Sequence, residues 1–256
     1  MAKKASIWKK VFGIFFLAAI CTAGYSGWKW LSAVKVVGIQ MQGLVNSTES
    51  EIREIIRVDT GMVLFELDDD ILEDRIRRHP WIMDAFVSRL PTGMLDIRVI
   101  ERRPVAQVMT SDGEISNYVD RNGFWMPMTE SAWYPVPIVS GDLESFNPVM
   151  PVKDRVVREM LFDLPEIGPQ ADALVSELMR TETGFEVRTT PEGLHESIPV
   201  LLGDSNFRNK LQLLQAFWEQ EVTLRQDLEF ASIDLRFNSQ VVTKQQPRPL
   251  ESNTSN

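Results

Sequence analysis

The feature that most constrains this chain is a single apolar run close to its N-terminus. Four lysines within residues 1–10 are followed by 18 uncharged residues at 11–28, and aromatic residues flank the run on both sides. At about 1.5 Å per residue, a helix of this length lies near the lower limit for crossing a hydrocarbon core of about 30 Å. Aromatic side chains at both ends are typical of membrane interfaces. We therefore expect a transmembrane helix over residues 11–31.

The lysines before the run predict its orientation. Basic residues favour the cytoplasmic side, so residues 1–10 are expected in the cytoplasm and the bulk of the chain outside it, in a single-pass type II arrangement. One alternative is a signal peptide cleaved after Ala23, and another is a lipoprotein modified at Cys21. Ile20 is larger than a lipoprotein site accepts, and the aromatic cluster beyond Ala23 is unusual for a cleavage region.

The composition of the chain argues against nucleic acid as a partner. The 256 residues include 27 lysines and arginines against 36 aspartates and glutamates, a formal net charge of −9. A polyanion is repelled by such a chain. The sole cysteine lies within the apolar run, so we expect neither a disulfide nor thiol chemistry in the remainder. The length beyond the run is sufficient for two modest domains.

The segment 34–101 predicts a small α+β unit in the order strand, helix, helix, strand, strand. Thr48 followed by Glu51 is a capping box, and the isoleucines after it are spaced for one apolar helical face. Asp68 is placed to cap a second helix, which must stop before Pro80. Two strands follow, and the second alternates apolar and charged residues.

A set of motifs recurs along this segment at characteristic spacing: Gly43, 61–65 (GMVLF), Pro80-Trp81, Ala85, Val87, Pro91, Leu95, Ile97 and 101–106 (ERRPVA). With the order of elements, this set resembles a POTRA domain, and more narrowly the POTRA domain of the FtsQ/DivIB family of bacterial division proteins. In that family the POTRA domain follows a single membrane anchor. The resemblance therefore implies a POTRA domain (β-α-α-β-β) at 34–102 and a protein of the cell inner membrane whose bulk lies in the periplasm.

Residues 103–242 predict a second, mixed α+β domain with an antiparallel sheet. Hairpin signals stand at Asp112-Gly113 and Asn122-Gly123. Apolar spacing predicts helices near 156–164, 171–178 and 207–218, and strands at 184–190, 197–202 and 229–242. The polar tail 243–256 contains two prolines and is expected to be disordered.

The resemblance to the FtsQ/DivIB family continues through this second domain. It is carried by 119–123 (VDRNG), 137–141 (PIVSG), 200–203 (VLLG), Lys210-Leu211 and 233–237 (IDLRF), with Phe237 where the family commonly has tyrosine. It implies a divisome scaffold at the division septum that links early cytoplasmic division proteins to late periplasmic synthesis of septal peptidoglycan. Proteins of the family recruit FtsB, in complex with FtsL, through this C-terminal region. The short segment 1–10 leaves little for cytoplasmic partners to bind.

Partner-binding residues are expected on the last strand, because a final strand before a polar tail is often a sheet edge that a partner can extend. The resemblance places the contact at Arg236, Phe237, Ser239 and Val241. Our hypothesis is that Phe237 is an aromatic anchor and that Arg236 pairs with a partner carboxylate, while backbone pairing supplies the rest. The alternative is that Phe237 belongs to the core and Arg236 is solvated.

A charged cluster, Glu101-Arg102-Arg103, stands at the junction of the two predicted domains. One interpretation is that these residues form salt bridges between the domains. The other is that they form a docking surface for further membrane proteins of the divisome.

No pattern in the sequence predicts catalysis, a cofactor or a metal site. The two histidines, His79 and His195, stand apart from other ligands, and 68–70 (DDD) lacks the glycine and distal glutamate of a calcium loop. Neither a glycine-rich phosphate loop nor a nucleophile elbow occurs. We therefore expect a scaffold that is not an enzyme and has no small-molecule substrate.

Two other functions stay open beside the division scaffold. An exported POTRA-containing chaperone or transport accessory for outer-membrane proteins predicts a cleaved N-terminus and, as a rule, several POTRA units or an attached barrel, whereas one such unit is visible. A cell-wall hydrolase requires a nucleophile or paired acids, which we do not find.

Overall fold

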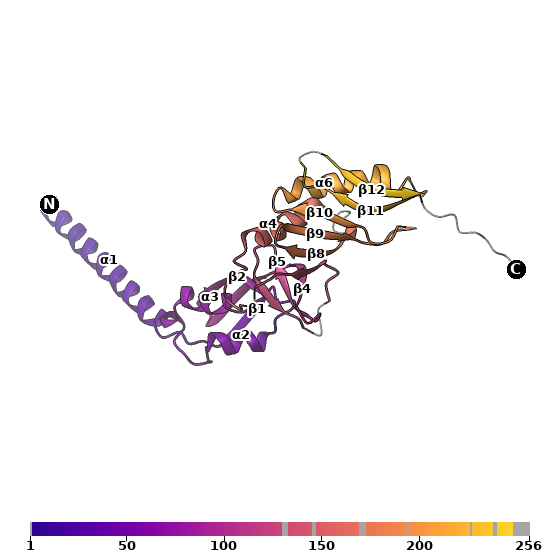
Figure 1. Ribbon diagram of the computed structural model, residues 1–256. Coiled ribbons are helices and arrows are strands. Elements are labelled where there is room, and N and C mark those ends of the chain that lie inside the picture. The colour runs from indigo at the N-terminus through magenta and orange to yellow at the C-terminus, as the bar shows by residue number, and fades with distance from the viewer. Residues whose placement is uncertain are drawn as a thin grey trace. The chain divides into compact units, whose positions relative to one another are not determined.

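The structure is a computed structural model of the 256-residue chain, and it describes residues 2–129, 133–144, 147–168, 173–193, 195–225, 227–237 and 240–247 (Figure 1). The chain divides into two compact units, Met1–Glu101 and Arg102–Asn256. Each unit has a hydrophobic core of its own.

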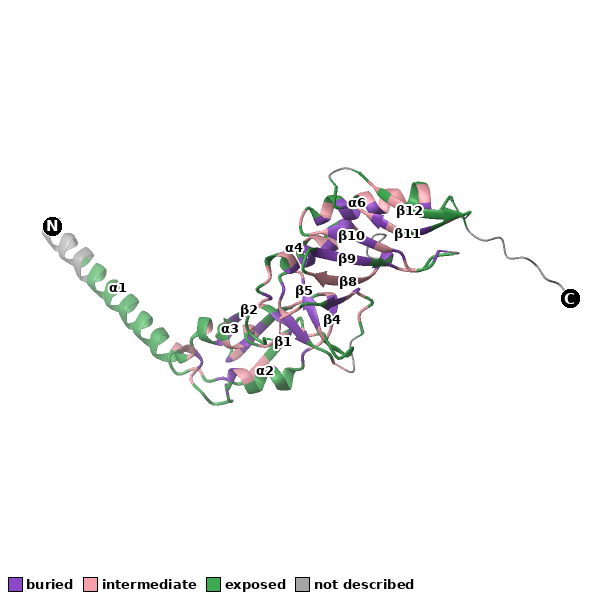
Figure 2. Ribbon diagram, viewed as in Figure 1, coloured by how far each residue is buried: buried purple, intermediate pink, exposed green. Residues whose placement is uncertain are grey.

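The first element is one long helix, α1 (Ala2–Leu31). Its residues 12–30 are exposed (Figure 2). Among the described residues, no helix combines the length and the apolarity needed to cross a membrane. The prediction of a transmembrane helix over 11–31 was therefore wrong. Three glycines, Thr22 and Ser26 dilute the apolar run, and Lys29 ends it.

The rest of unit 1 has the predicted order of strand, two helices and two strands. It consists of β1 (Gly38–Gln42), α2 (Glu49–Ile56), the 3-10 turn η1 (Leu64–Glu66), α3 (Asp69–Arg77), β2 (Ile82–Arg89) and β3 (Met94–Glu101). The sheet order is β1-β3-β2, in which β1 pairs parallel and β2 pairs antiparallel with the central β3. Both outer strands of this sheet are therefore edges.

Local sequence signals determine where the two helices begin. At α2, Thr48 Oγ1 accepts from the N–H of Glu51 at 3.3 Å, and the Glu51 carboxylate accepts from the N–H of Thr48 at 2.7 Å, so the predicted capping box is present. At α3, Asp68 Oδ1 accepts from the N–H of Ile71 at 3.2 Å. The apolar faces of both helices bury Ile52, Ile56, Leu72 and Ile76 against the strands. This packing supplies most of the stability of such short helices.

Unit 2 is built around a nine-stranded sheet in the order β12-β11-β10-β9-β8-β7-β4-β5-β6. Its strands are β4 (Pro104–Met109), β5 (Ile115–Asp120), β6 (Trp125–Pro127), β7 (Ile138–Gly141), β8 (Val175–Thr181), β9 (Gly184–Thr189), β10 (Pro199–Gly203), β11 (Leu228–Asp234) and β12 (Val242–Pro247). The pairs β4–β7, β7–β8 and β10–β11 are parallel, so the sheet is mixed and the predicted purely antiparallel sheet was wrong.

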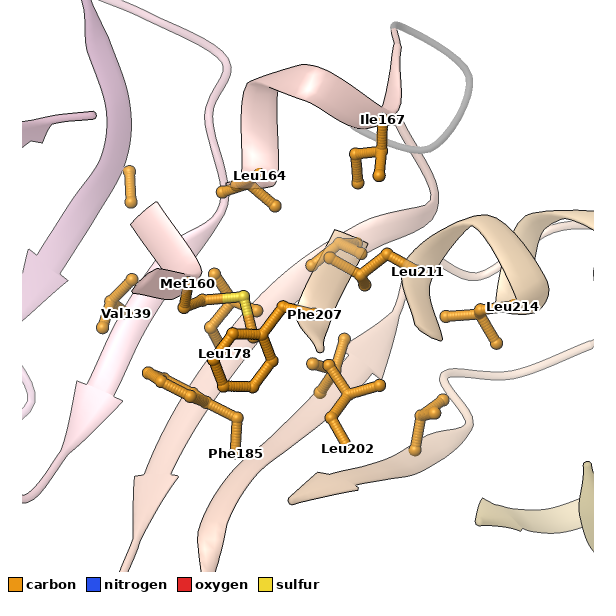
Figure 3. Close-up of a cluster of buried hydrophobic side chains, with 14 of the residues drawn as sticks. Val139, Met160, Leu164, Ile167, Leu178, Phe185, Leu202, Phe207, Leu211 and Leu214 are labelled. Atoms are coloured by element: carbon orange, nitrogen blue, oxygen red, sulfur yellow. The ribbon is translucent and has the colours of Figure 1, made fainter. Parts of the chain in front are cut away.

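Two helices and their extensions cover the core of unit 2. They are α4 (Arg155–Asp163) with the 3-10 turn η2 (Leu164–Ile167), and α6 (Phe207–Phe217) with the π-helical turn η3 (Trp218–Val222). Figure 3 shows Met160 of α4 and Phe207 of α6 gathered with Leu178 and Phe185 of the strands. Phe207 is completely buried, and its ring meets Phe185 edge to face at 5.7 Å.

Two predicted elements differ in kind from the observed ones. Of the helix expected near 171–178, residues 171–172 lie outside the described residues, residues 173–174 are helical, and the chain from Val175 onward forms strand β8, in which Val175 and Leu178 are buried. The spacing of a short run of apolar residues is compatible with a helix and with a strand. Residues 175–181 form a strand because they pair with β7 and β9. The strand expected over 229–242 is two strands, β11 and β12, and β12 occupies residues 242–247 of the segment predicted to begin a disordered tail.

Candidate partner-binding site

The C-terminal end of the nine-stranded sheet is the candidate site. β11 pairs parallel with β10, where Val200 faces Ile233, and antiparallel with β12, where Asp234 faces Val242. Within the described part of the chain, β12 has no neighbouring strand on its other side. An edge of this kind presents unpaired N–H and C=O groups that an extended peptide can bind.

The edge strand is open to solvent along its length. Five of the six residues of β12 are exposed, and Thr243, which faces the buried Ile233, is intermediate. Its sequence, VTKQQP, is mostly polar and shows no alternation of apolar residues. Such a strand is held mainly by its backbone pairing with β11, which explains why the sequence pattern predicted disorder beyond residue 243.

The predicted partner-binding residues lie beside this edge and not on it. Arg236, Phe237 and Val241 belong to the connection between β11 and β12, and Ser239 lies outside the described residues. The strand that precedes them, β11, has a neighbour on each side, and the partner-binding role of these residues stays a prediction. The outer edge belongs to β12.

The side chains in this connection differ in their exposure. Phe237 is 53% exposed, so the interpretation of Phe237 as a core residue does not hold. Val241 packs in part against the core of unit 2. Leu235, between the strand and these residues, is fully buried, and its N–H donates to the carbonyl of Leu201 at 2.9 Å. The connection therefore begins at the buried Leu235 and exposes the ring of Phe237 to solvent.

Arg236 has a carboxylate partner within the chain. Its Nη2 donates to Oδ2 of Asp234 at 2.6 Å, and its Nε donates to Oδ1 at 3.0 Å. The hydrogen bond from the Arg236 side chain lowers the pKa of Asp234, and the nearby positive charge of Lys210 adds to that effect against the opposing influence of burial. Arg236 is therefore already paired with a carboxylate through Nε and Nη2, and a second carboxylate would share the guanidinium with Asp234 or replace it.

Sequence reasoning missed the role of Lys210 under this site. The side chain is buried, and its Nζ donates to the carbonyl of Leu202 at the end of β10. Burial lowers the pKa of Lys210, while the carboxylates of Asp204 and Asp234 oppose that shift. A Cβ atom at Gly203 would lie 3.4 Å from Cγ of Arg236 and 3.6 Å from Nζ of Lys210, so both side chains lie beside this glycine. The sequence signal for a buried lysine is the position of Lys210 on the apolar face of the helix predicted near 207–218.

Glu101, the first residue of the charged cluster, has a structural role within unit 1. Its carboxylate accepts from the N–H groups of Val45 at 3.0 Å, Asn46 at 2.8 Å and Ser47 at 3.0 Å, and from the hydroxyl of Ser47. Burial by itself raises the pKa of Glu101, but these hydrogen bonds outweigh it and lower the pKa. Glu101 therefore fixes the loop that leads into α2.

The other two residues of the cluster belong to unit 2 and differ from each other. Arg102 pairs with Asp120 at 2.8 Å, with side chains 10% and 3% exposed, and its guanidinium carbon lies 4.0 Å from the ring centroid of Phe124. Arg103 is exposed. Of the three residues expected at a docking surface, Arg103 alone presents an exposed side chain there.

The histidines and the acidic triplet take local roles. His79 Nδ1 accepts from the N–H of Trp81 at 3.3 Å, and burial lowers the pKa of His79. Asp68 caps α3, and Asp69 pairs with Arg89 at 2.8 Å. Across the described ranges, no three His, Cys, Asp or Glu side chains are grouped to hold a metal ion.

Comparison with known proteins assigns both units to one family. Residues 34–102 match a family model described as "POTRA domain, FtsQ-type", and residues 103–244 match one described as "FtsQ/DivIB, C-terminal related".

Full-length relatives agree with these matches. The chain is 35% identical over 253 residues to "Cell division protein FtsQ" of Rhodothermus marinus, covering 97% of this chain and 92% of the relative. It is 34% identical over 236 residues to the protein of the same name in Salinibacter ruber, with 90% of each chain covered. With a protein of that name from Geotalea daltonii it shares 24% identity over 92% of this chain and 86% of the relative. The resemblance seen in the sequence is thereby confirmed, and the chain belongs to the FtsQ/DivIB family of cell division proteins.

Proposed function

We propose that this chain is a non-enzymatic scaffold of the division septum that recruits FtsB- and FtsL-type coiled-coil proteins by strand addition along β12. Recruitment would link early cytoplasmic division proteins to late synthesis of septal peptidoglycan. The observation that carries the proposal is the exposed edge of β12 at the end of the nine-stranded sheet, in a chain of the FtsQ/DivIB family.

Strand addition accounts for affinity through the backbone and for specificity through a few side chains. A partner strand along β12 would pair its N–H and C=O groups with those of residues 242–247. Phe237, 53% exposed, is suited to be an aromatic anchor, because aromatic side chains give large contact areas at low entropic cost. Arg236 already pairs with Asp234, so a partner carboxylate would share the guanidinium with Asp234 or replace it, and the net contribution of Arg236 to affinity is smaller than that of a free arginine.

Arg103 is the residue of the charged cluster best suited to a second contact with divisome proteins. It is exposed, whereas Glu101 and Arg102 hold partners within their own units. An exposed charge of this kind affects the rate of encounter more than the final affinity.

The test uses the full chain and two truncations that differ only in β12. One ends after residue 241 and lacks the strand, and the other ends after residue 247 and keeps it. Binding of an FtsB/FtsL-type complex is measured by pull-down and calorimetry, with thermal melting as the control for folding. We expect the shorter chain to lose binding and the longer one to keep it, with similar melting temperatures.

A second pair of variants tests the aromatic anchor. Phe237→Ala is expected to weaken binding by at least about tenfold, in the range of an interface hot spot. Phe86→Ala is the matched control, because Phe86 is 47% exposed but lies on β2 of unit 1. Full binding by the chain that ends after residue 241 would refute strand addition at β12. Capture of unfolded outer-membrane proteins in place of division proteins would favour the chaperone alternative.

A further inference from the structure

The edge strand of unit 1, β2, differs from β12 because side chains already occupy its outward backbone groups. The N–H of Val87 donates to Oε1 of Glu73 at 2.9 Å, and the carbonyl of Ala85 accepts from Nη2 of Arg77 at 3.2 Å. The N–H of Ala85 donates to Oδ1 of Asp84 at 2.9 Å. At the centre of the strand, three backbone groups that an incoming strand would need are therefore engaged.

The side chains that cover β2 form a regular series on α3, which we call the α3 ladder: Asp69, Glu73 and Arg77. Residues four apart lie on the same side of a helix, so the three side chains follow one line. Asp69 pairs with Arg89 at 2.8 Å, Glu73 binds the N–H of Val87, and Arg77 Nε pairs with Asp84 at 2.8 Å. From Asp69 to Arg77 the residue numbers along α3 increase, while those of their partners on β2 decrease from Arg89 to Asp84. Helix α3 therefore runs antiparallel to β2 along its edge.

The ladder is itself held together by charge. Arg77 Nη2 lies 3.0 Å from Oε2 of Glu73, and the Glu73 side chain is only 17% exposed. Hydrogen bonds in which one partner is ionised are stronger than neutral ones. An incoming strand would have to displace the Glu73 carboxylate and the Arg77 guanidinium. These two groups bind each other, and each also binds a backbone group of β2.

The other edge of the same sheet carries a smaller version of this arrangement. Arg53 Nη2 on α2 donates to the carbonyl of Ile39 on β1 at 3.1 Å, and Arg53 pairs with Glu49 at 3.5 Å. Helices α2 and α3 thus each place an arginine, paired with a glutamate four residues earlier, on a carbonyl of the neighbouring edge strand. Covering an edge with a helix and charged side chains is a known way for a protein to avoid unwanted strand pairing.

We infer that the α3 ladder closes the edge of β2 to strand addition, so that an extended partner segment is directed away from unit 1. Among the described residues, no side chain bonds to the backbone of β12, which leaves that edge open. The part of the inference that concerns β12 rests on the proposed function, whereas the closure of β2 stands on unit 1 alone.

The experiment asks whether removal of the ladder opens the edge. A synthetic peptide with the sequence of residues 82–89 (IMDAFVSR) is titrated into the isotope-labelled full chain, and the amide resonances of Ala85 and Val87 are followed. In the wild-type chain we expect no binding at these amides. In the double variant E73A/R77A we expect binding at least tenfold tighter than any seen in the wild type, with shifts confined to β2 and its neighbours.

A matched control separates this effect from a general loss of charge. Glu221 and Arg225 form a comparable pair four residues apart at 2.8 Å in unit 2, so E221Q/R225Q should behave as the wild type. The amide resonances of β1 and β3 report whether unit 1 stays folded. If E73A/R77A unfolds, R77Q carries the same comparison, because it uncovers the Ala85 carbonyl and keeps Glu73 on Val87.

Two results would overturn the inference. One is binding of the peptide at β2 of the wild-type chain as tightly as in the variant, and the other is no binding at β2 of a folded variant. Resonances of β12 report separately on the edge used in the proposed function, so failure at β2 and failure at β12 are distinguishable.

Discussion

Arg236 and Asp234, two residues apart in the chain, form a pair in which the guanidinium donates two hydrogen bonds to one carboxylate, at 2.6 and 3.0 Å. The pair stands at the end of β11, directly before the exposed Phe237. The backbone N–H of Arg236 also donates to Oδ1 of Asp234 at 3.0 Å, which adds to this contact. The pairing makes Asp234 the internal competitor for any carboxylate that a partner offers to Arg236.

The first prediction concerns the acidity of Asp234. Arg236→Gln is expected to raise the pKa of Asp234 toward its ordinary value, because the hydrogen bond from Arg236 is the main cause of the lowered pKa. A carboxyl group whose pKa is lowered by folding stabilises the protein above its unfolded pKa, and that stabilisation is lost as the pH falls through the folded value. Carboxyl carbon NMR against pH measures the shift. An unchanged titration curve in R236Q would show that another group controls Asp234.

The second prediction concerns competition between Asp234 and the partner. If Arg236 pairs with a partner carboxylate, Asp234→Asn is expected to strengthen partner binding by up to about fivefold, the range of an exposed ion pair. Calorimetric titration of the full chain with an FtsB/FtsL-type complex measures the change. The double variant D234N/R236Q should show no gain, and a gain that persists in it would exclude Arg236 as the cause.

The third prediction concerns Glu101. Replacement by alanine removes the acceptor for three backbone N–H groups of residues 45–47, and we expect unit 1 to lose about 3 kcal/mol of unfolding free energy. Glu101→Gln retains one acceptor oxygen and should cost less. Urea unfolding, followed through the amide NMR signals of β2 and β3, measures both variants. Equal costs for alanine and glutamine would show that the charge, and not the number of acceptors, matters.

The fourth prediction concerns the core of unit 2. Phe207 is fully buried and meets Phe185 at 5.7 Å, so Phe207→Ala is expected to cost about 4 kcal/mol through lost burial and the cavity it leaves. Because each unit has its own core, the unfolding of unit 1 should change little. Hydrogen exchange resolved by segment measures the two units separately. A matching loss of protection in β2 and β3 would show that the two units unfold together.

Local signals in the sequence predicted much of unit 1. Thr48 and Glu51 form the expected capping box, Asp68 caps α3, and β3 alternates as its residues indicate. These features depend on residues three or four positions apart, or on a period of two, so the sequence displays them directly. In unit 2, the helical stripe that begins at Phe207 was predicted for the same reason.

The same reasoning failed where an element depends on distant strands. The apolar residues around Leu178 fit a helix as well as a strand, and pairing with β7 and β9 decides between them. The polar residues 242–247 have no apolar period, and they form β12 because β11 offers a backbone edge. The apolar run near the N-terminus indicated a membrane span, but among the described residues no helix has both the length and the apolarity that a span requires.

By itself, the sequence determined the family, the order of elements in the first unit and the caps of its helices, because these are recorded in local spacing and in motifs. Tertiary structure alone decided which strand edges are open. In the folded chain the α3 ladder lies along β2, β12 is uncovered, and Arg236 forms an ion pair with Asp234. The physical reason is that an edge is closed or open according to which side chains reach its backbone groups, and that reach depends on how helices pack beside strands and on which strands pair.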